Sequence, residues 1–338
     1  MRVLVTGGAG YIGSVVTAQL VQTGHTVVVY DNLSKGSRTA VPGGATLIVG
    51  DVGDAISLEK TFRDYNFDAV MHFAAFIEAG ESMLAPEKYF RNNTANALTL
   101  LESVLKYRVA RFVFSSTAAL YGDPRRIPID EDDAQRPTNA YGASKLLVED
   151  MISWFHRVHS LRYASLRYFN AAGATLERGE DHDPETHLIP IVLDVALGKR
   201  PSVSIFGADY PTPDGTCIRD YIHVSDLAAA HLLALDRLGK DKEPERLTYN
   251  LGNGLGFSVR EVIEAARRVT GSAIPTVEVP RRPGDPAVLV ASCQKIKREL
   301  GWSPKYQDLD SIVESAWRWR LAHPRGYRGA IALQPSKS

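Results

Sequence analysis

A tyrosine and a lysine stand one helical turn apart near the middle of the chain. Tyr141 and Lys145 lie in the segment AYGASKLLVE, and their i,i+4 spacing places both side chains on one face of a helix. A tyrosine with a pKa of about 10 is a poor base at neutral pH. A lysine ammonium and a nicotinium ring close to it both favour the phenolate and lower that pKa. We therefore expect Tyr141 to exchange a proton with a substrate hydroxyl, while Lys145 binds the ribose of a nicotinamide cofactor that takes the hydride.

A cluster of hydroxyl side chains precedes this pair. Ser115, Ser116 and Thr117 end an apolar run that reads as a strand. Open α/β sheets bind their ligands at the carboxyl edge of the strands, so we expect Thr117 to orient or relay the proton of Tyr141. This setting disfavours the alternative, in which the tyrosine is exposed at a helix start beside a solvated lysine.

Three glycines predict a dinucleotide site at the start of the chain. Gly7, Gly10 and Gly13 follow the first apolar run, where a helix start can hold a pyrophosphate on its backbone amides. Asp31 ends a second strand about 20 residues further on, where a carboxylate accepts from ribose hydroxyls and repels a 2′-phosphate. The pattern favours NAD. A lysine and an arginine just beyond Asp31 keep NADP open, and a tight turn without a ligand is the other alternative.

The same cofactor is expected to contact residues at the ends of the next strands. Asp51 can meet the adenine amino group, and Phe73 and Ala74 would line the cleft. The predicted cofactor contacts are Gly7, Gly10, Tyr11, Ile12, Gly13, Asp31, Asn32, Asp51, Val52, Phe73, Ala74, Asn92, Ser115, Tyr141, Lys145 and Tyr168.

The elements that must position these residues alternate between strands and helices. Helical spacing is present at 86–107, 144–159 and 221–238, and β-branched or aromatic runs suit buried strands. Because strand-helix-strand crossovers are right-handed, we expect an α/β fold with an open, doubly wound, mostly parallel sheet of the Rossmann type. The predicted strands cover 3–7, 26–31, 46–51, 69–75, 111–116, 164–170 and 247–253.

After Asn170 the chain changes to stretches rich in proline and glycine, which indicates a second domain. We expect an NAD-binding Rossmann domain over 1–171 and a smaller α/β domain over 172–338 that binds the substrate. Residues 221–253 are expected to pack back onto the first domain, so the second domain is discontinuous. The residues from Gln334 onward are expected to be frayed.

The composition excludes several classes of protein. The 338 residues carry 39 Lys+Arg and 39 Asp+Glu, so no basic surface is available for nucleic acid or an anionic membrane. Cys217 and Cys293 are too few for a disulfide framework. The first residues lack the apolar core and cleavage site of a signal peptide, so we expect none, and no apolar run is near the roughly 20 residues that cross a bilayer. We therefore expect a cytoplasmic protein.

One loop superficially suggests a metal. The segment GEDHDPETH at 179–187 contains His182, His187 and several carboxylates, but their spacing matches no regular metal motif. We expect a solvated, mobile loop beside the substrate cleft and no metal site. His72 and His223 lie beside apolar segments and are expected to be satisfied core histidines.

Together these motifs resemble the extended short-chain dehydrogenase/reductase superfamily, and within it the UDP-galactose (UDP-glucose) 4-epimerases. The similarity covers nearly the whole chain. Its most specific segment is FGADYPTPDGTCIRDYIHVSDLA at 206–228. The segments TGGAGYIGS at 6–14, FSSTAALYGD at 114–123, YGASK at 141–145 and RRPGDPA at 281–287 follow the family order.

The resemblance implies an isomerase that interconverts UDP-glucose and UDP-galactose. NAD would oxidise the sugar at C4 and return the same hydride to the other face, so the cofactor would be resident. Tight binding of UDP would leave the sugar free to turn. By analogy, the helices at 86–107 and 144–159 would form the contact of a homodimer.

The resemblance also implies the substrate contacts. Asn170, Arg219 and Arg282 would bind the diphosphate, for which guanidinium groups are suited. Asp285 would meet the uridine ribose, and Phe206 can stack on the uracil. The predicted substrate contacts are Thr117, Tyr141, Asn170, His187, Leu188, Phe206, Arg219, Arg282, Asp285 and Val288.

Three positions depart from the family pattern. Thr117 stands where serine is frequent and keeps the hydroxyl. Ile77 replaces a lysine near the nicotinamide and removes one cofactor contact. Val288 occupies a position resembling the gate of the sugar pocket, where a bulky tyrosine excludes N-acetyl groups. Because valine is intermediate in size, we expect some tolerance of UDP-GlcNAc and UDP-GalNAc.

Three alternative functions stay open at this point. Epimerases of UDP-glucuronate or UDP-xylose differ only in the sugar pocket. A nucleotide-sugar 4,6-dehydratase shares the glycines, the tyrosine and the lysine, but Ala118 and Ala119 stand where dehydratases carry Asp-Glu. A non-catalytic NAD-sensing scaffold typically loses the tyrosine-lysine pair that is present here.

Overall fold

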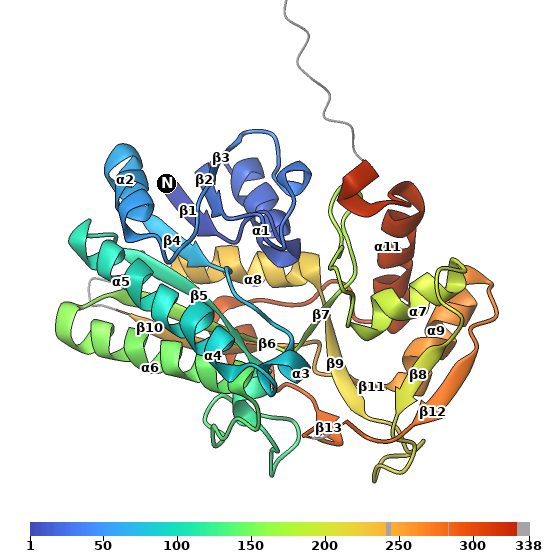
Figure 1. Ribbon diagram of the computed structural model, residues 1–338. Coiled ribbons are helices and arrows are strands. Elements are labelled where there is room, and N and C mark those ends of the chain that lie inside the picture. The colour runs from blue at the N-terminus through green and yellow to red at the C-terminus, as the bar shows by residue number, and fades with distance from the viewer. Residues whose placement is uncertain (241–244, 283, 330–338) are drawn as a thin grey trace, which may run out of the picture.

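The computed structural model describes residues 1–240, 245–282 and 284–329, and the expected fraying from Gln334 lies outside them. The chain forms a larger lobe around one sheet and a smaller lobe beside the ends of its strands (Figure 1). Among the described residues, no helix combines the length and the hydropathy of a membrane span.

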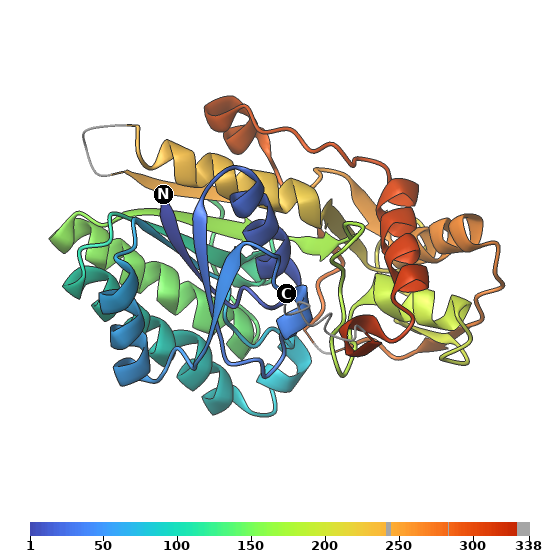
Figure 2. The same cartoon turned by 90° about the horizontal axis from the view of Figure 1, so that it is seen from above.

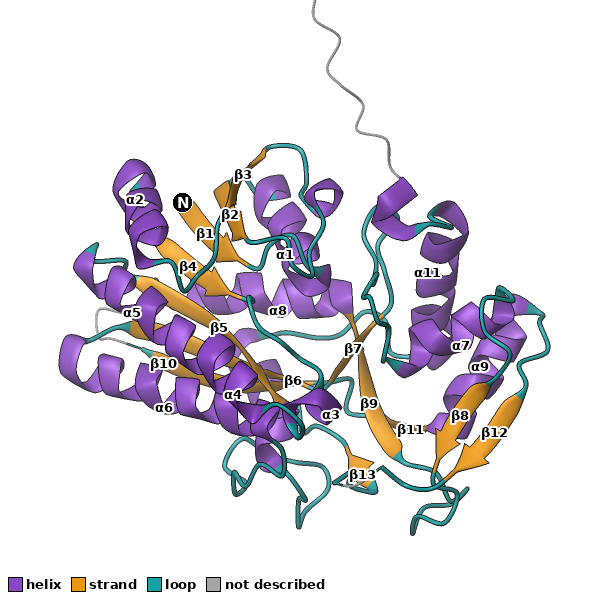
Figure 3. Cartoon of the chain, viewed as in Figure 1, coloured by secondary structure: helices purple, strands orange, loops and turns teal. Residues whose placement is uncertain are grey.

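A parallel sheet of seven strands forms the larger lobe, in the order β10-β6-β5-β4-β1-β2-β3 (Figure 3). All six pairings are parallel, and the central strands are buried runs of valine, leucine and phenylalanine, as expected when both faces are covered. The strands are β1 (Arg2–Thr6), β2 (Thr26–Asp31), β3 (Ala45–Val49), β4 (Ala69–His72), β5 (Arg111–Thr117), β6 (Arg162–Tyr168) and β10 (Arg246–Leu251).

Helices cover the two faces of this sheet. On one face, α1 (Tyr11–Gln22) and α8 (Val224–Arg237) pack into one core with the sheet. On the other face, α2 (Ala55–Tyr65), α5 (Asn96–Lys106) and α6 (Ala140–His159) form a second core. Figure 2 shows α8 and α6 on opposite sides of the strands. The expected doubly wound fold is confirmed.

The smaller lobe combines short strands with three helices that share a third core. β9 lies at its centre and pairs with β7, β11 and β13, while β8 pairs with β12. The strands are β7 (Asn170–Ala172), β8 (Val203–Phe206), β9 (Ile218–His223), β11 (Gly256–Ser258), β12 (Thr276–Val279) and β13 (Val288–Leu289). The helices are α7 (Leu188–Ala196), α9 (Val259–Thr270) and α11 (Leu309–Ala322).

Short helical segments complete the described chain. They are α3 (Ala79–Ser82), α4 (Pro86–Tyr89), a π-helical segment (Phe90–Ala95), α10 (Gln294–Leu300) and 3₁₀ turns at Arg38–Ala40, Ala118–Tyr121 and Gly326–Gly329. Residues 221–253 contribute to both lobes, because the end of β9 joins the smaller sheet whereas α8 and β10 pack in the larger lobe. The boundary proposed between residues 171 and 172 falls within β7, and the division into domains stays a prediction.

Two expected helices differ from the structure. The segment 86–107 is a short α4, a π-helical segment and α5 instead of one continuous helix. Within the π-helical segment, Asn93 accepts from the Phe76 backbone N–H at 2.9 Å and donates to the Ser144 hydroxyl at 3.1 Å, which fixes this wider turn against α6. The helix expected at 221–238 begins at Val224, because the three residues before it pair with β7 as part of β9.

Candidate active site

The start of α6 carries the tyrosine-lysine pair. The side chain of Asn139 caps this helix by accepting from the Gly142 N–H at 2.8 Å. A Cβ added to Gly142 would lie 2.5 Å from the Ala119 carbonyl oxygen, so glycine lets the helix approach the turn after β5. Tyr141 lies in the first turn, and Lys145 lies one turn later. The helix start therefore faces the carboxyl end of β5.

The Tyr141 phenol and the Thr117 hydroxyl share a hydrogen bond. The Thr117 oxygen also accepts from the Ala119 N–H at 3.1 Å, which caps the 3₁₀ turn after β5 and holds the hydroxyl in place. Lys145 Nζ donates to the Ser115 carbonyl oxygen at 2.8 Å. The structure thus brings all three predicted catalytic residues together at the carboxyl edge of the sheet.

Burial dominates the electrostatics of the pair in the protein alone. Burial raises the pKa of Tyr141, with a smaller increase from the charge of Glu78, and the hydrogen bond from Thr117 lowers it. Lys145 is not among the causes that shift this pKa in the protein alone, and the lowering expected from Lys145 together with a nicotinium ring stays a prediction. Burial lowers the pKa of Lys145 to about 7, since its side chain is 2% exposed and lies against the Phe114 ring. Both protonation states of Lys145 are thus available near neutral pH.

The turn between β1 and α1 is shaped to admit an anion. Gly7 has φ of +74°, and a Cβ added there would lie 2.5 Å from the Ala74 backbone nitrogen. A Cβ on Gly13 would overlap the Gly7 carbonyl oxygen. Gly10 is the N-cap residue of α1, and the first turn of that helix carries no acidic side chain. These residues leave backbone N–H groups open to a phosphate.

Two carboxylates organise the loops next to this turn. Asp31 accepts from the Ala9 N–H at 2.9 Å and the Leu33 N–H at 2.8 Å, which ties the glycine turn to the end of β2. Burial raises the pKa of Asp31. Asp51 is exposed and accepts from the side-chain amide of Asn32 at 2.7 Å. Each carboxylate oxygen has a second lone pair, so both groups can still accept from a nucleoside.

The aromatic cofactor candidates engage protein groups. Tyr11 donates from its hydroxyl to the Gly173 carbonyl oxygen at 2.5 Å. Tyr168 is hydrogen-bonded to His231, whose ring centroid lies 5.0 Å from that of Phe73. The remaining candidates lie in the first turn of α1, after β3, after β4, in the π-helical segment and at the end of β5; these are Ile12, Val52, Ala74, Asn92 and Ser115.

The candidate nucleotide contacts form two pairs in the smaller lobe. The Arg282 guanidinium lies over the Phe206 ring, 3.8 Å from its centroid. Arg219 Nη2 lies 3.8 Å from an oxygen of Asp285. In this structure the guanidinium of Arg282 therefore covers a face of the ring for which uracil stacking is expected.

The other substrate candidates flank β9 or precede α7. Asn170 begins β7 and pairs with Tyr221 near the end of β9, whereas Val288 begins β13 and pairs with Ile218, the first residue of β9. Pairing with β9 fixes the placement of both residues. Two further candidates, His187 and Leu188, are the N-cap and the first residue of α7.

Two residues that influence the cofactor and proton-transfer candidates belong to no sequence motif that predicts their role. Glu78 follows β4, and its charge raises the pKa of Tyr141. Its carboxylate lies 3.7 Å from Lys35 Nζ. His231 on α8 holds the Tyr168 hydroxyl. The roles of Glu78 and His231 depend on contacts between segments that are distant in sequence. Only the position of Glu78, after a strand expected to line the cofactor cleft, could have indicated its role.

The expectation for His72 and His223 is confirmed, whereas the expectation for the loop at 179–187 is wrong in part. His72 bonds the Thr6 hydroxyl at 2.7 Å and His223 bonds the Ser315 hydroxyl at 3.0 Å, so both are satisfied core histidines. Burial lowers the pKa of His72 to about 3 and that of His223 to about 4. The loop at 179–187 is not simply solvated, because Glu180 within it is buried.

Comparison with known proteins identifies the family. A family model described as NAD dependent epimerase/dehydratase family matches residues 3–252. The UDP-glucose 4-epimerase of Streptomyces lividans is 54% identical over 327 residues, which cover 96% of this chain and 98% of that protein. A crystal structure of a UDP-glucose 4-epimerase has a TM-score of 0.93 at 51% identity, covering 97% of this chain and 99% of the other.

A third similar protein was solved with ligands. The UDP-glucose 4-epimerase of Bifidobacterium longum, in complex with NAD+ and UDP, has a TM-score of 0.91 at 38% identity. The match covers 96% of this chain and 100% of that one. Family model, sequence and structure agree over nearly the whole length. The chain therefore belongs to the NAD dependent epimerase/dehydratase family, within its group of UDP-glucose 4-epimerases.

Proposed function

We propose that this protein interconverts UDP-glucose and UDP-galactose by NAD-dependent epimerisation at C4 of the sugar. One observation carries the proposal: Thr117, Tyr141 and Lys145 meet at the same sheet edge at which the glycine turn of β1 and α1 opens. The similarity to proteins named UDP-glucose 4-epimerase supports the choice of this reaction over the other 4-epimerases and the dehydratases.

The residues present fit NAD as the resident cofactor. A side chain on Gly7 or Gly13 would collide with the backbone of Ala74 or of Gly7, so glycine permits the tight turn that presents backbone N–H groups to a pyrophosphate. The carboxylate of Asp31 favours ribose hydroxyls over a 2′-phosphate. Lys35, which could have favoured NADP, donates to the Asp183 carbonyl oxygen at 3.1 Å and lies near Glu78. When bound, NAD supplies hydride acceptance and donation.

The protein's own part in the reaction is proton transfer and positioning. Tyr141 takes the proton of the C4 hydroxyl and returns it after the sugar has turned. Thr117 orients the phenol through their shared hydrogen bond. Lys145 holds the ribose beside them and, with a pKa of about 7, carries a positive charge below that pH. Ala118 and Ala119 offer no acid for the loss of water, which argues against a dehydratase.

The smaller lobe is proposed to hold UDP through Asn170, Arg219, Arg282 and Asp285, with the uracil on Phe206. For this, Arg282 would move from the Phe206 ring toward the diphosphate. Guanidinium groups bind phosphate oxygens through paired hydrogen bonds, which exceed the stacking energy that Arg282 would lose.

The sugar pocket is proposed to admit some N-acetyl sugar. Val288 and Leu289 form β13, and successive strand residues point to opposite faces, so only one of them can face the sugar. We expect measurable turnover of UDP-GlcNAc, at least tenfold below that of UDP-galactose. Val288→Tyr should abolish it and spare UDP-galactose, with Leu289→Tyr as the matched variant. No turnover of UDP-GlcNAc by the unchanged protein would remove this expectation.

One experiment tests the proposed reaction. The purified protein is incubated with UDP-galactose without added NAD, and the sugar nucleotides are separated by chromatography. We expect UDP-glucose at equilibrium and release of NAD on denaturation. A 4-keto-6-deoxy product would identify a dehydratase, and unchanged UDP-galactose from a protein that releases NAD would favour a binding role. UDP-glucuronate and UDP-xylose, assayed in parallel, distinguish the other epimerases.

A cytoplasmic location and a homodimer belong to the same proposal. Cys217 and Cys293 are both buried and free, which suits a reducing compartment. Exposed apolar side chains on the outer surfaces of α5 and α6 support the homodimer.

A further inference from the structure

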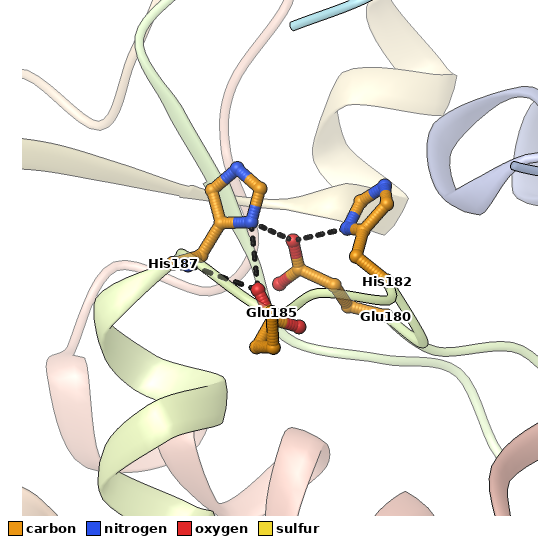
Figure 4. A group of neighbouring side chains, drawn as sticks. All are labelled: Glu180, His182, Glu185 and His187. Atoms are coloured by element: carbon orange, nitrogen blue, oxygen red, sulfur yellow. Dashed lines mark hydrogen bonds and ion pairs between the residues drawn. The ribbon is translucent and has the colours of Figure 1, made fainter. Parts of the chain in front are cut away.

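Four side chains from the loop between β7 and α7 converge on one point (Figure 4). They are Glu180, His182, Glu185 and His187, and one ligand atom of each lies within 4.8 Å of all the others. The reaction proposed above uses none of these side chains in proton transfer. Their convergence therefore calls for a separate explanation.

The imidazoles point the same ring atom at the carboxylates. His187 Nδ1 lies 2.8 Å from Glu180 Oε1 and 2.9 Å from Glu185 Oε1. His182 Nδ1 lies 3.1 Å from the same oxygen of Glu180. In a tetrahedral zinc site with bonds of about 2.0–2.1 Å, neighbouring ligand atoms are about 3.3 Å apart. An ion among these four atoms would require the three short contacts to lengthen by a few tenths of an ångström and the wider separations, which reach at most 4.8 Å, to shorten.

The cluster is enclosed and negatively charged. The side chains of Glu180 and Glu185 are only 8% and 6% exposed. The second oxygen of Glu185 is buried without a hydrogen-bond partner, and the nearest guanidinium nitrogen of Arg320 is 3.7 Å away. Arg320 forms an ion pair with Glu185, whereas among the described residues Glu180 has only the two imidazoles as partners, so a further cation would stabilise this buried cluster. His187, which is 38% exposed, leaves an access route from solvent.

We propose that Glu180, His182, Glu185 and His187 bind one divalent transition-metal ion of the zinc class. Two imidazole nitrogens with two carboxylate oxygens suit zinc, whereas calcium and magnesium prefer oxygen ligands only. A divalent ion bound by neutral imidazoles would supply positive charge beside both carboxylates and release the protons of the two histidines. Binding exchanges protons for the metal and involves no electron transfer. The site takes no part in the proton transfer of the proposed epimerase reaction, although His187 is also a predicted substrate contact.

The location gives the ion a structural role. Beside Glu180, the Gly179 N–H donates to the Tyr327 hydroxyl at 3.1 Å, and Lys35 from the larger lobe donates to the Asp183 carbonyl oxygen. At the other end of the loop, His187 is the N-cap residue of α7 in the smaller lobe. The ion therefore fastens the segment that crosses between the lobes to the start of α7.

The first test measures how many zinc ions each chain binds and how tightly. Untagged protein is stripped with a chelator, dialysed against ZnCl₂ and analysed by plasma mass spectrometry, and affinity is measured by competition with a chromophoric chelator. We expect one zinc per chain, and at least a hundredfold weaker binding in His182→Gln. The matched control is His159→Gln, which changes an exposed histidine on α6 and should bind zinc as the unchanged protein does. Equal affinity in the two variants would overturn the site.

The second test uses the unchanged protein, so it does not depend on whether His182→Gln folds. X-ray absorption at the zinc edge should give nitrogen and oxygen ligands at about 2.0–2.1 Å with the multiple-scattering signature of two imidazoles. Zinc should also raise the melting temperature of the stripped protein. A sulfur ligand at about 2.3 Å, which only Cys217, Cys293 or a methionine could supply, or a shell of water oxygens alone, would refute the proposal.

Discussion

Tyr141 meets the requirements of its proposed task only in part when the protein is considered alone. Its phenol is held by Thr117, which is the geometry that proton transfer needs, but burial raises its pKa. An additional positive charge near the phenol is therefore required for it to act as a base near neutral pH. Glu78 opposes that charge, so its pairing with Lys35 matters to the site.

Replacing Tyr141 by phenylalanine tests the proton transfer directly. Tyr141→Phe removes the one hydroxyl that can take the C4 proton, and general acid-base catalysis is worth about 10²–10⁴ in rate. We expect kcat for UDP-galactose to fall by that factor, while UDP affinity by calorimetry and NAD content change less than threefold. Tyr65→Phe, which alters a half-buried tyrosine of α2 away from the site, serves as the control. Unchanged turnover in Tyr141→Phe would reject the catalytic assignment.

Lys145 should lower the free energy of unfolding of the protein near neutral pH. Its pKa is about 7 in the folded chain and 10.5 in the unfolded chain, so the unfolded state binds more protons between these values. Stability therefore rises with pH across this window. Lys145→Met removes the penalty and should stabilise the NAD-free protein at pH 7 by roughly 1–3 kcal/mol, after the lost bond to the Ser115 carbonyl is counted.

Urea unfolding at pH 7 and at pH 9.5 measures this effect. We expect the gain in Lys145→Met to shrink at the higher pH, together with a large loss of activity at both. Lys60→Met, which changes an exposed lysine on α2, should alter stability by less than about 0.5 kcal/mol. A Lys145→Met protein that is less stable at pH 7, or equally shifted at both values, would contradict the lowered pKa.

At the scale of elements, the capped start of α6 connects stability with activity. Asn139→Ala removes the acceptor for the Gly142 N–H and should cost about 1 kcal/mol of stability. Because Tyr141 lies in that first turn, kcat should also fall by about tenfold at a temperature where the variant stays folded. Asp54→Ala removes the equivalent cap of α2, which carries no site residue. It should lose similar stability, measured by thermal melting, and keep its kcat.

Equal activity losses in the two cap variants would mean that Asn139 acts only through global stability. A loss confined to Asn139→Ala would indicate that the cap orients Tyr141. The two helices differ in this respect because Tyr141 lies in the first turn of α6, whereas α2 carries no residue of the site.

Local patterns predicted the elements whose determinants are local. The strands follow from apolar runs, and the glycine turn and the tyrosine-lysine pair follow from spacing, so the sheet edge of the site was predictable. The break at Phe90–Ala95 was not, because Asn93 fixes it through Phe76 and Ser144. The start of α8 depended on strand pairing between β7 and β9 for the same reason.

The parts of the site that were missed depend on contacts between distant segments. Arg282 on the Phe206 ring joins residues from β8 and the loop before β13. The buried carboxylate of Glu180 lies in a segment whose sequence reads as a polar loop. No spacing rule reports how such segments fold against one another, whereas the helix start that carries Tyr141 is fixed by neighbours within four residues.

At the scale of the whole molecule, one outer face remains apolar. On α6, Leu147, Trp154 and Val158 are 44%, 61% and 65% exposed and lie at spacings of seven and four residues, and Leu98 is exposed on the neighbouring α5. Large apolar side chains gathered on one face of a soluble protein indicate an interface. We therefore expect a homodimer in which α5 and α6 of two chains pack together, at a distance from the site at the helix start.

Charge on this face should separate the dimer. In a twofold interface each substitution meets its own copy or that copy's neighbours, so Leu147→Glu and Trp154→Glu should each weaken association at least a hundredfold. Light scattering across a dilution series should give twice the mass of one chain for the unchanged protein and for Leu176→Glu, whose leucine is 82% exposed on a loop outside this face. The dilution series starts at about 0.1 mM and proceeds in 100-fold steps. An unchanged protein that is monomeric in this series would contradict the interface, and so would a Leu176→Glu variant that dissociates like the other two. Because α6 also carries Tyr141 and Lys145 at its buried end, separation should lower the melting temperature more than it lowers kcat.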